Sequence, residues 1–191
     1  MRCWLALVLA VLAAEALAQP NGVLLVAKPA LRDPNFVQTV VLVTRTPDGG
    51  AVGVILNRPG ERRLRNWPKP LYTGGPVMQQ VVIALFAAES PPREAAFSVL
   101  PQVYLSMHPK NLEALLAEPS PRMRLFSGFS GWAPRQLEAE IDSGGWYVTR
   151  ATPALVFRQD TSGMWNELVE LARGARTSRD PAPFVAAILV P

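Results

Sequence analysis

Residues 126–146 read FSGFSGWAPRQLEAEIDSGGW. The segment begins with Gly and Ser residues interleaved with aromatic ones, and it then passes through Pro134, which suits the first turn of a helix. Apolar residues spaced four apart follow on one helix face, and Gly144 suits a helix stop. We therefore predict a Gly-rich loop over residues 128–133 that leads into a helix beginning at Pro134.

Short apolar runs rich in Val, Ile and Leu, bounded by Pro, Asp and Gly, predict the β-strands of the chain. These runs cover residues 23–27, 39–44, 51–56, 81–87, 97–105, 123–129 and 184–190. The tetrapeptide Pro47-Asp48-Gly49-Gly50 has the turn chemistry to join the second and third strands as a hairpin.

Two further helices follow from apolar residues at spacings of three and four. One is predicted over residues 109–118, where Pro109 takes the first helical position. The other is predicted over residues 162–173, directly before Gly174. Strands dominate the first half of the chain and helices the second half, which favours an α+β fold over a doubly wound α/β sheet.

The N-terminus has the layout of a secretory signal peptide. Arg2 gives a positive start, residues 4–14 are apolar, and Ala16-Leu17-Ala18 forms an A-x-A cleavage signature. The apolar run is shorter than the roughly 20 residues that a membrane span needs. We predict a signal peptide over residues 1–18, a single domain over residues 19–191, and a periplasmic or secreted mature protein.

Cysteine and histidine are too scarce in this chain for most metal and thiol chemistry. The only cysteine, Cys3, lies in the predicted signal, so the mature chain would have no disulfide and no thiolate ligand. The single histidine, His108, cannot supply a multi-histidine zinc site. No phosphate-binding or dinucleotide-binding glycine motif is present. We expect neither a metal nor a cofactor.

Basic residues cluster in one segment of a chain whose formal net charge is +4. This segment either faces an acidic partner or an anionic surface, or it is a solvated loop between two apolar runs, which we favour. Its lone aromatic residue is not the stacking platform that single-stranded nucleic acids require, and nucleic acid is not an expected partner of an exported protein. The clustered residues are Arg58, Arg62, Arg63, Arg65 and Lys69.

Four separated blocks agree in order with one protein family. They are GVLLVAKPALRDP at residues 22–34, GVILNRP at 53–59, GGPV at 74–77 and the segment at 126–146. With these blocks the chain resembles the YqgE/AlgH family of bacterial proteins over most of its predicted mature length. The resemblance implies a single α+β domain in which a mixed sheet curls strongly into a barrel-like core flanked by helices. It implies no reaction, because most members of the family lack an assigned biochemical activity.

A polar site is predicted where the Gly-rich loop meets the following helix. Backbone N–H groups at such a helix start can hold a small anion or carboxylate. The alternative, which we favour, is that the glycines serve a purely structural tight turn. Polar residues at the end of a predicted strand either form a second wall or, as we favour, satisfy backbone groups of the adjoining loop. The predicted ligand- or partner-binding residues are Asn57, Arg58, Gly128, Ser130, Gly131, Trp132 and Gln136.

Our leading hypothesis is an exported, non-enzymatic binding or regulatory protein with an unknown protein or small-molecule partner. It rests on a polar Gly-rich loop without a catalytic constellation. One alternative is a hydrolase that uses Ser130, or the helix carboxylates Glu138 and Asp142, which lie four residues apart on one helix face. Another alternative is a transcription-linked regulator, which requires that the protein is not exported.

Overall fold

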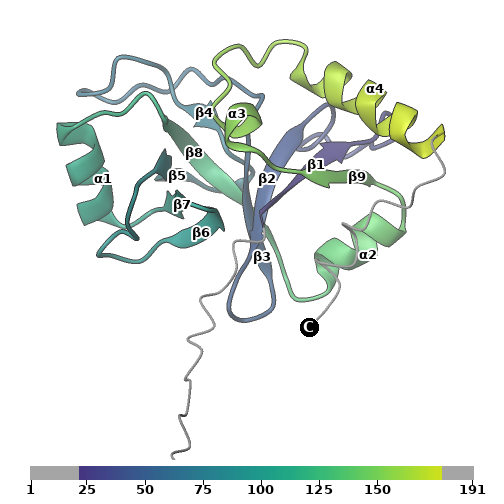
Figure 1. Cartoon of the computed structure of the whole chain (residues 1–191), viewed down its shortest axis with the longest axis horizontal. Coiled ribbons are helices and arrows are strands. Elements are labelled where there is room, and N and C mark those ends of the chain that lie inside the picture. The colour runs from purple at the N-terminus through teal and green to yellow at the C-terminus, as the bar shows by residue number, and fades with distance from the viewer. Residues whose placement is uncertain (1–21, 178–191) are drawn as a thin grey trace, which may run out of the picture.

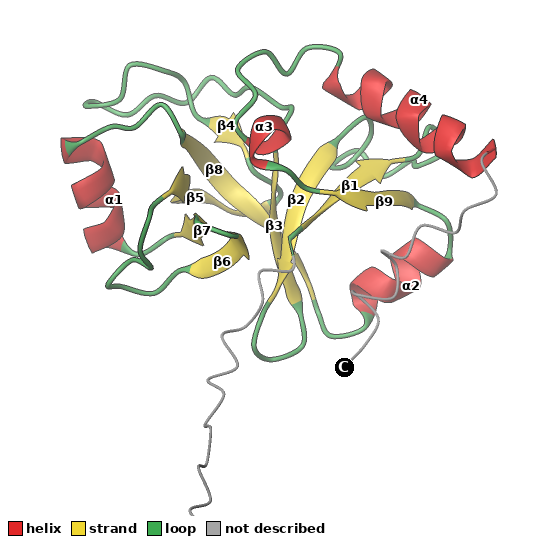
Figure 2. Cartoon of the chain, viewed as in Figure 1, coloured by secondary structure: helices red, strands yellow, loops and turns green. Residues whose placement is uncertain are grey.

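The computed structural model describes residues 22–177, which form a single α+β domain. The strands are β1 (Val23–Ala27), β2 (Val40–Arg45), β3 (Ala51–Ile55), β4 (Tyr72–Thr73), β5 (Val77–Ala87), β6 (Phe97–Leu100), β7 (Val103–Ser106), β8 (Met123–Trp132) and β9 (Trp146–Arg150). The helices are α1 (Pro109–Ala117), α2 (Gln136–Asp142), α3 (Pro153–Val156) and α4 (Met164–Thr177). Figure 2 shows the strands crossing the centre of the domain, with α1 at one end and α2 and α4 at the other.

The nine strands join one sheet in the order β6-β7-β5-β8-β3-β2-β1-β9, and the two-residue β4 pairs with β8 outside this path. The strand pairs are antiparallel except for β4 and β8, which run parallel. The long strand β8 joins the two halves, because its first part pairs with β5 and its last three residues pair with β3. Figure 1 shows the result, with β5 to β7 and α1 on one side of β8, and β1 to β3, β9, α2 and α4 on the other.

Alternating side chains build a core on each face of the sheet. On β1, Leu24 and Val26 enter a central cluster, whereas Val23 and Leu25 enter a cluster on the opposite face, as the two-residue period of a strand requires. Strands from both halves of the sheet contribute to the central cluster, together with α3 and α4. Leu137 of α2 packs into the second cluster, and the leucines of α1 pack into a third one beside β5, β7 and β8.

The predicted α+β class and the β2–β3 hairpin are confirmed. In the hairpin, Gly49 adopts a positive φ of 84°, and the Thr46 N–H donates to the Gly50 carbonyl at 3.0 Å. The expectation of a strongly curled, barrel-like sheet is wrong. Within residues 22–177, no strand pairing joins the edge strands β6 and β9, so the sheet stays open. Helices α2 and α4 pack at the β1–β9 end of the sheet and cover its apolar side chains, so these side chains are buried although the sheet does not close into a barrel.

Several predicted boundaries differ from the structure for local reasons. Residues 97–105 form two strands, because Gln102 adopts a left-handed φ of 62° and the chain reverses between β6 and β7. Helix α4 continues to Thr177, four residues past the end predicted at Arg173. The helix predicted from Pro134 begins at Gln136, and Gly144 ends it with a φ of 85°, as predicted.

The short elements β4, β9 and α3 are absent from the sequence prediction. Strand β9 reads WYVTR and is only partly buried, so it lacks the apolar run that marks the other strands. The predicted signal peptide at residues 1–18 and the predicted strand at residues 184–190 lie outside the described residues.

Candidate functional site

The predicted Gly-rich loop is part of strand β8. Gly128 adopts a φ of 70° and lies so close to the Val77 and Gly75 carbonyls that a side chain would clash with them. Ser130 is fully buried, and its hydroxyl donates to the Gly74 carbonyl at 3.2 Å. Gly131 pairs with β3. The predicted loop is wrong, because residues 128–132 lie in the sheet. The binding role predicted for these residues stays a prediction.

The aromatic residues of the same segment surround one carboxylate of α2. The indole N–H groups of Trp132 and Trp146 each donate to Glu140 Oε2 at 3.1 Å. The Gln136 amide donates to Glu140 Oε1 at 3.2 Å, and the Phe36 ring lies within 6 Å of both indoles, at 5.8 and 5.5 Å between centroids. We call these five residues the Glu140 cluster. It ties α2 to the sheet, which gives Trp132 and Gln136 a structural role.

Asn57 and Arg58 hold a loop rather than line a site with β8. The Asn57 side chain accepts from the Val40 N–H at 2.8 Å and donates to the Gln38 carbonyl at 2.9 Å. Arg58 donates to the carbonyl of Asn35 at 2.8 Å, and partial burial lowers the pKa of its guanidinium. Within residues 22–177, none of these hydrogen bonds reaches residues 128–136.

The basic segment does not form one patch of free cations. Arg62 donates to the Gln79 and Gln80 carbonyls at 3.1 and 2.9 Å and to the Ser127 hydroxyl at 3.2 Å. Arg58 donates instead to the Asn35 carbonyl, as described above. Among the five basic residues of this segment, only Arg63 and Arg65 are exposed and make no side-chain hydrogen bond or ion pair within residues 22–177.

The paired carboxylates of α2 are not arranged as an acid–base pair. Burial alone would raise the pKa of Glu138. The hydrogen bonds from Arg45 and from the Glu138 backbone, together with the charges of Arg45 and Arg135, outweigh this effect, and the pKa is lower than usual. Asp142 is exposed. A general acid needs a raised pKa, so the direction of the Glu138 shift disfavours that role.

His108 precedes α1 but makes no side-chain capping bond. Its Nε2 lies 3.6 Å from Glu94 Oε2, and its buried Nδ1 has no hydrogen-bond partner among the described residues. The same part of the chain holds no group of three or more His, Cys, Asp and Glu side chains placed for a metal ion. None of the helices in residues 22–177 is long and apolar enough to cross a membrane.

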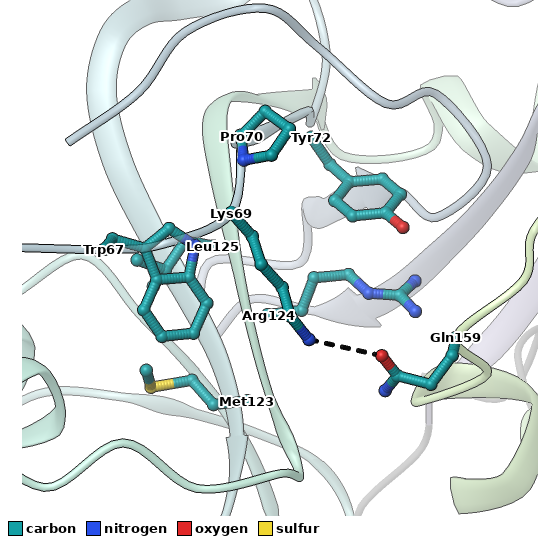
Figure 3. Close-up of a pocket in the computed structure, with 8 residues that line it drawn as sticks. All are labelled: Trp67, Lys69, Pro70, Tyr72, Met123, Arg124, Leu125 and Gln159. Carbon is teal, nitrogen blue, oxygen red and sulfur yellow. Dashed lines mark hydrogen bonds between the residues drawn. The ribbon is translucent and has the colours of Figure 1, made fainter.

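A cavity of about 40 Å³ lies between the segment that precedes β4, the start of β8 and the turn before α4. Figure 3 shows the eight residues that line it. They are Trp67, Lys69, Pro70, Tyr72, Met123, Arg124, Leu125 and Gln159. Of these residues only Lys69 was predicted from the sequence, as a member of the basic cluster.

Arg124 is the unusual member of this cavity. Only 6% of its surface is exposed, yet no carboxylate within residues 22–177 pairs with its guanidinium. Instead, the guanidinium donates to the carbonyls of Leu56, at 3.1 Å, and Arg158, and its central carbon lies 4.5 Å from the centre of the Tyr72 ring. Burial lowers its pKa and Tyr72 raises it, but a guanidinium remains charged. A buried charge without a counterion is costly unless other groups compensate it.

Lys69 places a second cation at the same cavity. Its ammonium donates to the Gln159 amide oxygen at 3.3 Å, and its side chain is exposed. In Figure 3 the polar ends of Lys69 and Arg124 both extend toward the side of the cavity where Gln159 lies, and Trp67 lies on the opposite side. Two cations, two aromatic rings and an amide form a suitable environment for a small anionic group.

One signal for this site was present in the sequence. Arg124 interrupts the apolar run Met123, Leu125, Phe126, and the alternation of a strand places it on the same face as the fully buried Phe126. An arginine on a core-facing strand position needs a specific environment, because arginine is rarely fully buried without partners.

Comparison with known proteins supports the resemblance noted in the sequence. The AlgH-like family, DUF179, matches residues 24–176. A UPF0301 protein of Thermobifida fusca is 39% identical over 185 residues, which cover 84% of this chain and 93% of the relative. A UPF0301 protein of Myxococcus xanthus is 35% identical, covering 75% of this chain and 85% of the relative.

Two solved structures share the fold. The crystal structure of protein DIP2367 from Corynebacterium diphtheriae has a TM-score of 0.65 at 26% identity, and the match covers 88% of this chain and 91% of the DIP2367 chain. The solution structure of the AlgH protein from Pseudomonas aeruginosa has a TM-score of 0.66 at 23% identity, and the match covers 87% of this chain and 97% of the AlgH chain. The sequence match and these folds together place the chain in the AlgH-like family.

Proposed function

We propose that this protein is a non-enzymatic binding protein that recognises a small anionic group in the Arg124 cavity and acts after export. The observation that carries the proposal is the nearly buried Arg124 guanidinium, which lines a cavity without a carboxylate partner in the described part of the chain. A bound anion would supply the missing countercharge, and such charge-assisted contacts are among the stronger hydrogen bonds in proteins.

The size of the cavity restricts the ligand. A volume of about 40 Å³ exceeds what one water molecule needs, but it is small beside the several hundred Å³ of a typical metabolite site. The cavity therefore suits one compact anionic group, such as a carboxylate or phosphate, at the end of a larger partner. Trp67 and Tyr72 would contact the part of the ligand next to the charge.

The hydrolase alternative has less support. Ser130 has no exposed surface and its hydroxyl is bonded to a backbone carbonyl, so substrate would not reach it without opening the sheet. Glu138 is held by Arg45, which favours its ionised form. The buried Ser130 is therefore not accessible as a nucleophile, and an ionised Glu138 cannot act as a general acid.

The binding proposal is tested by thermal unfolding with acetate, inorganic phosphate or chloride at matched ionic strength. We expect acetate or phosphate to raise the Tm of the protein above its value in chloride, because a ligand that binds only the folded state stabilises it. Lys69→Gln removes the exposed cation of the cavity and should abolish the difference. Arg63→Gln is the matched control, because Arg63 lies in the same segment but does not line the cavity. Equal Tm values in the three salts would overturn the proposal.

Export is tested separately by the intact mass of the protein from fractionated native cells. A chain that begins at Gln19 and is found outside the cytoplasm supports export. A full-length chain in the cytoplasm would refute it and would favour the transcription-linked alternative.

A further inference from the structure

A second and larger hollow lies between α1 and the segment that connects β5 to β6. Its volume is about 320 Å³, which falls within the range of small-molecule sites. Phe86 and Ala88, from the end of β5 and just after it, line it from one side, and Ala114 and Leu115 line it from α1. We call this hollow the α1 groove. It is separate from the Arg124 cavity, since the two share no lining residue.

The apolar face of α1 is incompletely covered at this groove. Leu112, Leu115 and Leu116 are only half-buried, whereas Leu137 of α2 is 4% exposed. Ala114, which also lines the groove, is small and exposed. Burial of this apolar surface by a ligand is favourable at roughly 25 cal/mol per Å².

Charged side chains also line the groove, and one of them has no partner. The Glu94 carboxylate lies 3.3 Å from the Lys110 ammonium and 3.6 Å from the His108 imidazole. Arg93 is exposed, and no hydrogen bond or ion pair to it exists within residues 22–177. With Glu94 already neutralised by Lys110, the groove combines an apolar floor with one unpaired cation at its side.

We propose that the α1 groove binds a linear aliphatic carboxylate, with the hydrocarbon chain against Phe86, Ala114 and Leu115 and the carboxylate paired with Arg93. The apolar lining is the reason for proposing a hydrocarbon chain, and the charge of Arg93 is the reason for proposing a carboxylate on the ligand. A guanidinium and a carboxylate match geometrically as a two-point hydrogen-bonding pair. This site is independent of the anionic group proposed for the Arg124 cavity.

The test is calorimetric titration of the purified protein with octanoate and, as the uncharged probe of equal chain length, 1-octanol. We expect saturable octanoate binding at one site per chain, and weaker binding of octanol. Arg93→Gln should weaken octanoate binding about tenfold, since it removes a charge-assisted pair, and should leave octanol binding unchanged. Ala114→Phe should abolish both by filling the groove.

Two variants serve as controls. Ala117→Phe adds the same side chain at an exposed position of α1 that does not line the groove, and it should leave binding unchanged. Lys69→Gln alters only the other cavity and should also leave octanoate binding unchanged, which separates this proposal from the proposed function. Circular dichroism checks that each variant is folded.

Several results would overturn the proposal. One is the absence of saturable octanoate binding to the wild type, and another is equal affinity for octanoate and octanol. A third is unchanged octanoate affinity in Arg93→Gln. Concentration-dependent dimerisation that Ala114→Phe abolishes, without octanoate binding, would instead assign the groove to a second copy of this chain.

Discussion

Glu140 and Arg124 are both charged side chains held against the sheet, and their surroundings are opposite. Glu140 accepts hydrogen bonds from two buried indoles and an amide, so both of its carboxylate oxygens are used. Arg124 is more deeply buried than most arginines, yet its charge faces two carbonyls and a ring, without a carboxylate among the described residues. The comparison teaches that the most conspicuous segment of the sequence builds a structural cluster whose hydrogen bonds are satisfied. A single inconspicuous arginine, in contrast, keeps a buried charge without a carboxylate partner among the described residues.

The largest expected effect is at the Glu140 cluster. Glu140→Ala leaves the two nearly buried indole N–H groups without their acceptor. We expect a loss of about 2–4 kcal/mol in the free energy of unfolding, because each unsatisfied buried donor costs about 1–3 kcal/mol. Urea unfolding measures the loss, and Glu113→Ala on the exposed face of α1 is the control. A loss as small as that of the control would show that the cluster is not a structural anchor.

Replacement of Arg124 by methionine should have a smaller effect on stability. Arg124→Met leaves the Leu56 and Arg158 carbonyls without their donor but also removes a costly buried charge. We expect a net loss of about 1–3 kcal/mol in urea unfolding. Arg122→Met, at an exposed position two residues earlier, should cost far less. If Arg124→Met instead destabilises the protein more than Glu140→Ala does, the conclusion that Glu140 is the better satisfied of the two charges is wrong.

The Arg45–Glu138 ion pair should contribute less to the free energy of unfolding than Glu140 or Arg124 does. Its contribution should also depend on pH. The folded-state pKa of Glu138 is below its ordinary value of 4.5, so the stabilisation is present above that value and is lost as the pH falls through the folded-state pKa. Glu138→Gln should therefore lower the Tm at about pH 7 by an amount equivalent to less than about 1 kcal/mol, and this effect should shrink as the pH falls below 4.5.

The control for this pH series is Asp142→Asn, on the same helix but exposed and without an ion pair in the described residues. Its Tm difference from the wild type should change little over the same pH range. A Glu138→Gln effect that grows toward low pH would contradict the direction of the pKa shift.

The smallest expected effect is that of Lys69→Gln on stability in chloride. Lys69 is exposed, and its one side-chain hydrogen bond within residues 22–177 is to the Gln159 amide oxygen at 3.3 Å. We expect a change within about 0.5 kcal/mol in urea unfolding. A larger loss would mean that Lys69 supports the fold, and its effect on anion-dependent stability could then not be assigned to the cavity.

Most long elements could be predicted because their signal is local. The Val- and Leu-rich runs of β1, β2 and β3 are short and bounded by turn residues, and α1 and α4 have apolar residues at helical spacing. The Gly-rich segment misled the prediction. Its glycines resemble those of a loop, but Gly128 is required because the Val77 and Gly75 carbonyls approach β8 too closely for a side chain.

The candidate site could be predicted only in part. Lys69 was placed in a basic cluster, and Arg58 and Arg62 of that cluster are instead bonded to backbone carbonyls. Arg124 gave a weak signal, as a charge within an apolar strand. Its partners Leu56, Tyr72 and Arg158 are far from it along the chain, and local patterns carry no information about such distant neighbours.

The sequence by itself determined the α+β class, the β2–β3 hairpin, the end of α2 at Gly144 and membership of the AlgH-like family. These features depend on periodicity, on turn residues and on motifs that are contiguous in the chain. Only the tertiary structure decided that the sheet stays open, that Glu140 is enclosed by Trp132 and Trp146, and that Arg124 lies at a cavity with Lys69. The physical reason is that strand order, burial and charge pairing are set by contacts between segments distant in sequence.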